Sequence, residues 1–155
     1  MTPLHRLVRG FRRDERGAAV VEFALVLPLL LLLVFMLIDA TRAFYTLNSL
    51  ISAAREGARY ASAQALDCPT PSQAQQDAVK DKVVNAAVLL GGTELTRSYV
   101  QVTLGVAGGG AATCENVQVR IENYPFRPAT PLANIVGADS ILMTREAVFR
   151  WERAP

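Results

Sequence analysis

The sequence has 155 residues, enough for one domain of ordinary size, and 51% of them are hydrophobic, with a mean hydropathy of +0.22. The net charge of +2 comes from residues 1–17, where five arginines outnumber two acidic residues, so the rest of the chain has no basic excess to bind nucleic acid. The apolar residues are concentrated in one segment, which excludes a uniformly apolar domain.

This apolar segment covers residues 18–38, and a helix of its 21 residues extends roughly 30 Å, the thickness of a bilayer core. Basic residues precede it, so we expect the N-terminus in the cytoplasm and the rest of the chain exported. The alternative is a removed secretory signal, but such signals have about 7–15 apolar residues and a small-residue cleavage site. Residues 39–42 do not provide that site. We therefore predict a single-pass membrane anchor.

Two residues within the apolar segment are unusual. Pro28 removes one helical hydrogen bond, which membrane-spanning helices tolerate. Glu22 carries a carboxylate, which is costly in hydrocarbon. It lies near the cytoplasmic end, where its side chain can reach the interface, and it follows Gly17 by five residues. Glu22 is therefore either a tolerated edge residue or a functional one.

A helical pattern continues beyond the apolar segment, into residues 39–66. Apolar residues recur there at three- and four-residue steps, at Ala43, Phe44, Leu47, Leu50, Ile51, Ala54, Ala58 and Ala61. We predict one helix from about Ala18 to about Ala65, apolar in its first half and amphipathic in its second.

Small residues form two rows on the second half of this helix. One row contains Ser49, Ala53, Gly57, Ala61 and Ala65, and the other contains Ala54, Ala58 and Ser62. Small residues four positions apart let another backbone approach closely. Either the chain's own sheet packs there, or helices of related subunits do so in an assembly, and the pattern is compatible with both.

A second helix is predicted at the start of residues 67–155. Ser72 and Gln75 have the spacing of a capping box, which predicts a helix from about Gln73 to Leu90. The glycine pair at 91–92 is expected to end it.

Three strands are predicted after this helix. Apolar and polar residues alternate over 100–106, 117–124 and 141–151, and the last strand is expected to be antiparallel. A proline-rich loop over 123–139 connects the second and third strands. One apolar face of such a sheet needs a cover, which the two helices can supply, so the predicted fold class is α+β.

Two cysteines, Cys68 and Cys114, lie on the expected exported side. They do not form a C-x-x-C pair, which argues against a metal or redox site. A disulfide between them is the natural interpretation in an oxidising compartment, and two buried free thiols are the alternative.

The sequence contains no catalytic constellation. His5, the only histidine, lies in the leader, so neither a metal cluster nor a nucleophile–histidine–acid set can be assembled. The glycines of "GVAGGGA" lack the lysine and the helix start of a phosphate loop. We predict a protein that is not an enzyme and has no metal, no cofactor and no small-molecule substrate.

The start of the helix resembles a known family. A polar leader, Gly17, and then "AAVVEFALVLPLLLLLVFML" with glutamate at the fifth position resemble the processing site of type IV pilin-like proteins. With the continuation "ISAAREGARYAS" and a small α+β region, the chain is similar to the TadE-like minor pilins, or pseudopilins, of tight-adherence (Flp) pilus systems. The resemblance is strong over residues 12–65 and looser beyond.

This resemblance implies specific roles for residues near Gly17. A prepilin peptidase would cleave after Gly17 on the cytoplasmic face, and Ala18 would become the new N-terminus. Glu22 would then pair with the N-terminal amine of a neighbouring subunit during assembly. A close resemblance to the major pilins of these systems would imply a Glu-Tyr pair at this position and a chain that ends soon after the span. This chain has Glu22–Phe23 and a large exported region, which favours a minor pilin.

The resulting hypothesis is a bacterial inner-membrane subunit that spans the membrane once and helps to assemble an adhesive pilus. Its expected organisation is a cleaved leader (1–17), a transmembrane helix (18–38), a helical continuation (39–66) and an exported domain (67–155). Its expected partners are the prepilin peptidase, other pilin-like subunits, the pilus assembly platform and membrane lipid. The alternative is an uncleaved single-span membrane protein with an exported binding domain unrelated to pili. A periplasmic enzyme with a signal anchor is a third class, for which the sequence supplies no reactive group.

Overall fold

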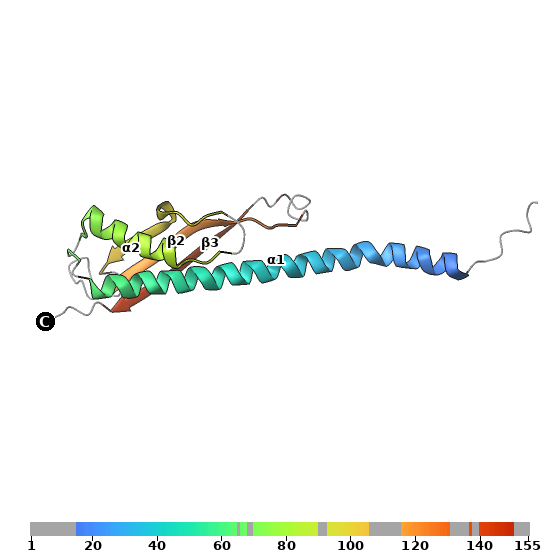
Figure 1. Ribbon diagram of the computed structural model, residues 1–155, viewed down its shortest axis with the longest axis horizontal. Helices are drawn as coiled ribbons and strands as arrows, with labels where there is room; N and C mark the ends of the chain where they lie inside the picture. The colour runs from blue at the N-terminus through green and yellow to red at the C-terminus, as the bar shows by residue number, and fades with distance from the viewer. Residues whose placement is uncertain are drawn as a thin grey trace, which may run out of the picture. The chain divides into compact units, whose positions relative to one another are not determined.

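A computed structural model describes residues 15–64, 66–67, 70–89, 93–105, 116–130, 137 and 140–150. Its elements, in chain order, are helix α1 (Glu15–Ala63), helix α2 (Gln73–Ala86), the 3-10 turn η2 (Arg97–Tyr99) and strands β1 (Val100–Leu104), β2 (Asn116–Phe126) and β3 (Ile141–Arg150) (Figure 1). The strands form one antiparallel sheet in the order β1-β2-β3. The α+β fold class is therefore confirmed.

The chain divides into two units, Met1–Ile38 and Asp39–Pro155, and the boundary falls within α1. The helix begins at Glu15, three residues before the predicted start, and its last residue is Ala63. Pro28 lies within the helix, as membrane-type helices allow.

Helix α2 begins where the sequence predicts but ends earlier. The Ser72 hydroxyl accepts a hydrogen bond from the Gln75 N–H, and the Gln75 side chain accepts one from the Ser72 N–H, so the predicted capping box is present. The helix ends at Ala86, whereas we predicted Leu90, which lies outside the described residues. The Val88 N–H donates to the Ser49 hydroxyl of α1 at 2.9 Å, so it is bonded to α1 instead of continuing the helix.

Strand β2 is longer than predicted. The strand predicted over 117–124 extends to Phe126, so the prediction of a loop is wrong for Pro125 and Phe126, which pair with Leu142 and Ile141 of β3. A bulge lies between Ile121 and Tyr124, and Asn123 adopts a positive φ of 53° within it. Strand β1 pairs only as far as Ile121, so Pro125 has β3 as a neighbour on one side and no β1 partner on the other. A proline, which has no backbone N–H, is tolerated there because no strand on that side would accept a hydrogen bond from it.

The core of the second unit lies between the helices and the sheet. Buried apolar residues come from both helices and all three strands: Leu50, Ala53, Ala54, Ala58, Ala61, Val79, Val83, Val100, Val117, Val119, Ile121, Tyr124, Phe126, Met143 and Ala147. The helix residues are mostly alanines and the strand residues are mostly larger. Because alanine keeps the helix surface shallow, the helix backbone approaches the sheet closely.

Gly57 marks the tightest point of this packing. A Cβ atom built on Gly57 would lie 2.2 Å from Cγ2 of Val83 in α2 and 3.6 Å from Cγ1 of Val119 in β2. Both helices and the sheet therefore meet at this glycine, and no larger side chain fits between them.

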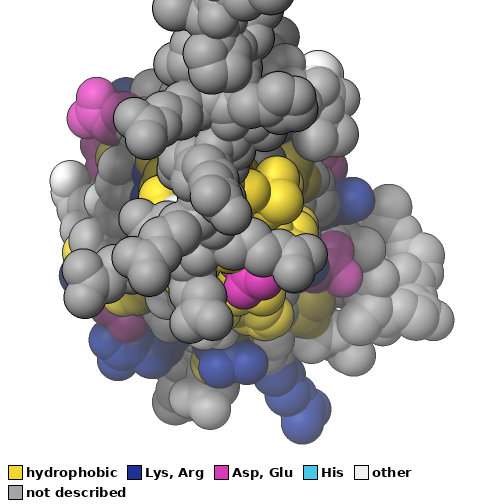
Figure 2. Space-filling model, turned by 90° about the vertical axis from the view of Figure 1, so that its right-hand side faces the viewer, with side chains coloured by type: hydrophobic (Ala, Val, Ile, Leu, Met, Phe, Trp, Pro, Cys, Tyr) yellow, Lys and Arg dark blue, Asp and Glu magenta, His cyan; other side chains and the backbone are white. Residues whose placement is uncertain are grey.

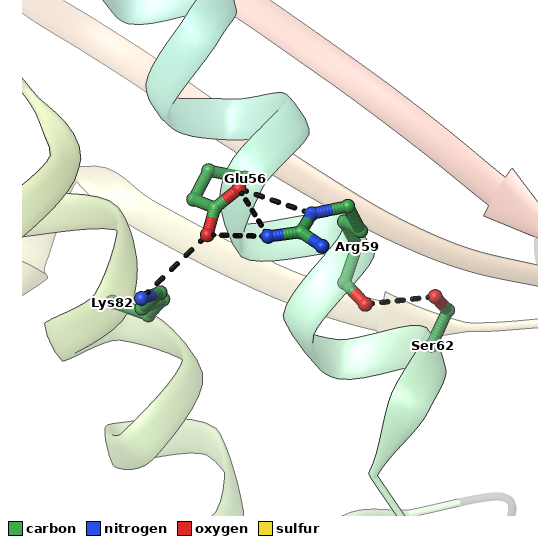
Figure 3. Close-up of polar contacts among 4 residues, drawn as sticks. All are labelled: Glu56, Arg59, Ser62 and Lys82. Atoms are coloured by element: carbon green, nitrogen blue, oxygen red, sulfur yellow. Dashed lines mark hydrogen bonds and ion pairs between the residues drawn. The ribbon is translucent and has the colours of Figure 1, made fainter.

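Charged groups join the two helices on the outside of the core. The carboxylate of Glu56 accepts hydrogen bonds from the Arg59 guanidinium at 3.0–3.1 Å and lies 3.6 Å from the Lys82 ammonium of α2 (Figure 3). The hydrogen bond from Arg59 is the main cause that lowers the pKa of Glu56. The Ser62 hydroxyl donates to the Arg59 carbonyl at 2.9 Å, which satisfies a polar group on the helix face that carries the alanines (Figure 3).

Candidate functional site

The apolar first part of α1 is the most distinctive feature of the N-terminal unit. One described helix segment, Gly17–Ala63, is long and apolar enough to cross a membrane, with a mean hydropathy of 2.9 over its most apolar window, of which no residue is buried. Its large side chains, Val20 to Ile38, are exposed. Hydrophobic side chains are also visible in yellow on the face drawn in Figure 2. Exposed apolar surface of this size is unfavourable in water and favourable in lipid.

The residues that the sequence analysis predicts to act in maturation and assembly lie at the start of this segment. Gly17, Ala18, Glu22 and Phe23 are all exposed, and a Cβ atom built on Gly17 would meet no atom within 4 Å. Gly17 lies in the first turn of α1, where backbone N–H groups have no partner within the helix. The glycine is therefore sterically accessible in the first turn of α1.

The small residues of α1 lie in a different environment from Glu22. Ala53, Gly57 and Ala61 are buried in the second unit, and Ser49, which is half-buried, accepts the hydrogen bond from Val88. Their packing partners therefore include α2 and the sheet of the same chain. The remaining predicted site residues, Cys68 and Cys114, lie outside the described residues, as does Ala65.

Asp39 forms a contact that the sequence did not suggest. It is the first residue after the apolar segment, and its carboxylate accepts hydrogen bonds from the Ala129 N–H at 3.0 Å and from the Thr130 hydroxyl. Arg42, one turn along the helix, lies 3.4 Å away. These contacts fasten the segment after β2 to the first turn of the second unit. A partner 90 residues distant leaves no signal in local sequence patterns.

The charge of Asp39 is stabilised by these donors. Partial burial raises the pKa of this carboxyl, but the hydrogen bonds from Thr130 and Ala129, together with the charge of Arg42, outweigh that effect and hold the pKa below its usual 3.8. Arg42 also lies over the ring of Phe126, 5.8 Å from its centroid, so one arginine contacts both the carboxylate and the end of β2.

We expect Asp39→Asn to destabilise the second unit by about 1–2 kcal/mol at neutral pH, since a charged acceptor is lost. Because the folded-state pKa is depressed, this contribution is present above pH 3.8 and is lost as the pH falls through the folded-state value. Urea unfolding of the full chain in detergent, at pH values from 7 to 3, measures the difference in the free energy of unfolding between wild type and variant.

A matched control is Asp77→Asn, whose carboxylate lies on the surface 3.9 Å from Arg97. Exposed pairs of this kind contribute less than about 1 kcal/mol. An equal effect of the two substitutions, or an Asp39→Asn effect that does not shrink in acid, would contradict the assigned role of Asp39.

Among the residues that the structure describes, no group of three His, Cys, Asp or Glu side chains could hold a metal ion. A surface pocket of about 240 Å³ lies between the end of α1 and the start of α2, and its lining includes Tyr60, Leu66 and Ala78. The described residues that line it include no nucleophile–base pair.

Comparison with protein families gives a similarity for the first part of the chain. The model described as "TadE-like protein" matches residues 17–59. Residues 17–59 are therefore similar to TadE-like proteins. This matched segment begins at Gly17, includes Glu22 and extends through most of α1. No curated protein matches the chain, and no solved structure matches it.

Proposed function

We propose that this chain is a minor pilin-like subunit that helps to assemble a tight-adherence pilus for surface attachment. The observation that carries the proposal is the TadE-like match, which begins at Gly17 and covers an exposed apolar helix with one early carboxylate. In this function the apolar segment anchors the subunit in the bacterial inner membrane. The N-terminus lies in the cytoplasm, and the folded second unit lies outside it.

Maturation by a prepilin peptidase would separate Gly17 from Ala18. The exposure of both residues and the open space around Gly17 support this step. Because Gly17 lies in the first helical turn, the peptidase has to open only the end of α1 to reach the bond. Cleavage leaves a free amine on Ala18.

Assembly would then use Glu22 of the mature subunit. Its carboxylate is exposed at the start of an apolar helix, and in lipid the low dielectric strengthens attraction to a positive group. An amine freed at Ala18 of an adjacent pilin-like subunit is such a group. The other partners are the pilus assembly platform and membrane lipid, and the function needs no cofactor.

The mature N-terminus tests this proposal. We expect that coexpression with a prepilin peptidase converts the membrane-bound chain to a form that starts at Ala18, as read by N-terminal sequencing and intact mass. Expression without the peptidase, and a Gly17→Leu variant with it, should both retain residues 1–17. An uncut chain in every case would instead support an uncleaved single-span membrane protein with an exported binding domain.

A further inference from the structure

Strand β3 forms one edge of the sheet. Within the described residues it pairs with β2 on one side and with no strand on the other. It has 10 residues, whereas β1, which forms the opposite edge, has 5. Backbone N–H and C=O groups that point away from β2 therefore remain available along β3, and an edge of this kind is a template for a further strand.

An arginine on the helix-covered face of β3 has an unbonded donor. Arg145 pairs with Ile121, which is buried, so its side chain lies on the covered face of the sheet. Its Nη1 donates to the Thr144 carbonyl at 3.1 Å, but its Nε is buried and has no partner among the described residues. A buried donor without an acceptor is unfavourable, so an acceptor supplied from outside these residues would stabilise it.

A second arginine of β3 also has no carboxylate partner. Arg150, the last residue of the strand, is exposed, and no ion pair joins it to a described residue. Arg120 of β2 differs, since it lies 3.2 Å from Glu122 and 3.8 Å from Glu146. Because Glu146 already has this partner, β3 presents the positive charges of Arg145 and Arg150 without matching negative ones.

The two arginines of β3 lie on opposite faces of the sheet. Side chains of a strand alternate between faces, so the odd spacing of five residues places Arg145 on the covered face and Arg150 on the outward face. Leu142 and Val148, which are 63% and 48% exposed, share the outward face with Arg150. The free edge therefore combines backbone groups, apolar side chains and one positive charge on each face.

We propose that the free edge of β3 binds an extended acidic segment of a partner protein, which adds a fourth strand and places one carboxylate at Arg145 and another at Arg150. Residues directly opposite on neighbouring strands lie on the same face, so the two carboxylates lie five residues apart in the partner. A guanidinium binds a carboxylate through two parallel hydrogen bonds, which suits an arginine whose Nε is unbonded. The contact involves only the second unit, so it goes beyond the proposed function and does not depend on the membrane anchor.

An acidic partner is favoured over a second copy of this chain. No two of the 14 acidic residues in the sequence are five positions apart, so no strand of a second copy supplies both carboxylates. An uncharged partner strand is disfavoured as well, because an inward-pointing charge on an edge strand opposes pairing. A carboxylate opposite Arg145 removes that opposition.

Binding of a defined peptide to the full chain in detergent tests the proposal. The probe is a fluorescein-labelled decapeptide of alternating threonine and valine with glutamate at its third and eighth positions, a placement that is the same in both strand directions. A second peptide has glutamine at both positions. A third keeps the glutamates but is N-methylated at its two central residues, whose N–H groups point to opposite edges, so neither edge can pair.

We expect fluorescence anisotropy to show that the glutamate peptide binds about tenfold more tightly than the glutamine peptide, since charge-assisted hydrogen bonds are added. Arg145→Met and Arg150→Met should each reduce this ratio to about threefold, and both together should abolish it. Because Arg150 is exposed, its replacement keeps the fold even if that of Arg145 does not. Arg97→Met, which removes a charge next to the opposite edge strand β1, is the matched control and should leave the ratio unchanged.

Several results would overturn the proposal. Equal binding of the glutamate and glutamine peptides is one, and an equal loss of the ratio with Arg97→Met is another. Undiminished binding of the N-methylated peptide would indicate charge attraction without strand pairing. Failure of all three peptides to bind would leave Arg145 as a charge that protects the edge. Cleavage at Gly17 plays no part in this measurement, so a negative result does not count against the proposed function.

Discussion

Replacement of Gly57 by leucine is expected to unfold the second unit while the apolar segment of α1 remains helical. A single Cβ at this position already approaches Val83 to 2.2 Å, and Val83 is fully buried and β-branched, so it cannot rotate away. Overpacking by one or two methylene groups costs about 1–3 kcal/mol, and leucine adds four carbon atoms, so we expect a loss above about 3 kcal/mol. Such a loss is a large fraction of the stability of a small unit.

Protease resistance and urea unfolding of the full chain in detergent measure this effect. Ser52→Leu is the matched control, because Ser52 lies on the exposed side of the same helix. The cause can be isolated with Gly57→Ala and Val83→Ala, alone and together. Since Val83→Ala removes the clashing methyl group, the double variant should lose less stability than the sum of the two single variants. Native-like resistance of Gly57→Leu would show that α1 does not pack as described.

Substitution of Glu22 by alanine is expected to leave membrane insertion intact and to reduce incorporation into pili by about tenfold or more. Removal of the carboxylate makes the apolar segment easier to insert, so the protein should remain in the membrane fraction. Loss of a charge pair in a low-dielectric environment exceeds the 1.4 kcal/mol that corresponds to a tenfold change. Glu22→Gln keeps the size of the side chain and removes only its charge, so it should have a similar effect.

Quantitative immunoblots of sheared pili and of membranes measure how much of the subunit is in pili and how much remains in the membrane. Glu94→Ala is a suitable control, because Glu94 is exposed in the second unit and lies far from the start of the helix in sequence. A normal amount of the Glu22→Ala subunit in pili would leave this residue as a tolerated carboxylate at the edge of the span. Retention of the leader in the variant would point to impaired cleavage rather than assembly.

Local patterns in the sequence were sufficient for most of the fold. The 21-residue apolar run has the length of a membrane span, and Ser72 with Gln75 forms the capping box that begins α2. Alternation of apolar and polar residues located all three strands, including Val117, Val119 and Ile121 on the buried face of β2. These features depend on residues two to four positions apart, or on one continuous run, so they can be read before any tertiary contact is known.

The candidate residues Gly17 and Glu22 were found from the sequence alone, because a spacing of five residues is local, and their roles stay predictions. The packing of Gly57 was not, since the row of small residues was equally compatible with a neighbouring helix of another subunit. Only the positions of Val83 and Val119 show which surface occupies that row. The tertiary structure likewise sets the ends of the elements.

Contacts between distant parts of the chain decided those ends. Helix α2 ends early because the Val88 N–H donates to the Ser49 hydroxyl. Strand β2 continues through Pro125 because β1 ends before it, so no β1 residue needs a hydrogen bond from position 125. Asp39 looked like an ordinary polar residue after the span until the chain brought Ala129 and Thr130 to it. Periodicity and capping act over one or two turns, whereas these bonds join residues up to 91 positions apart, whose proximity exists only once the core has formed.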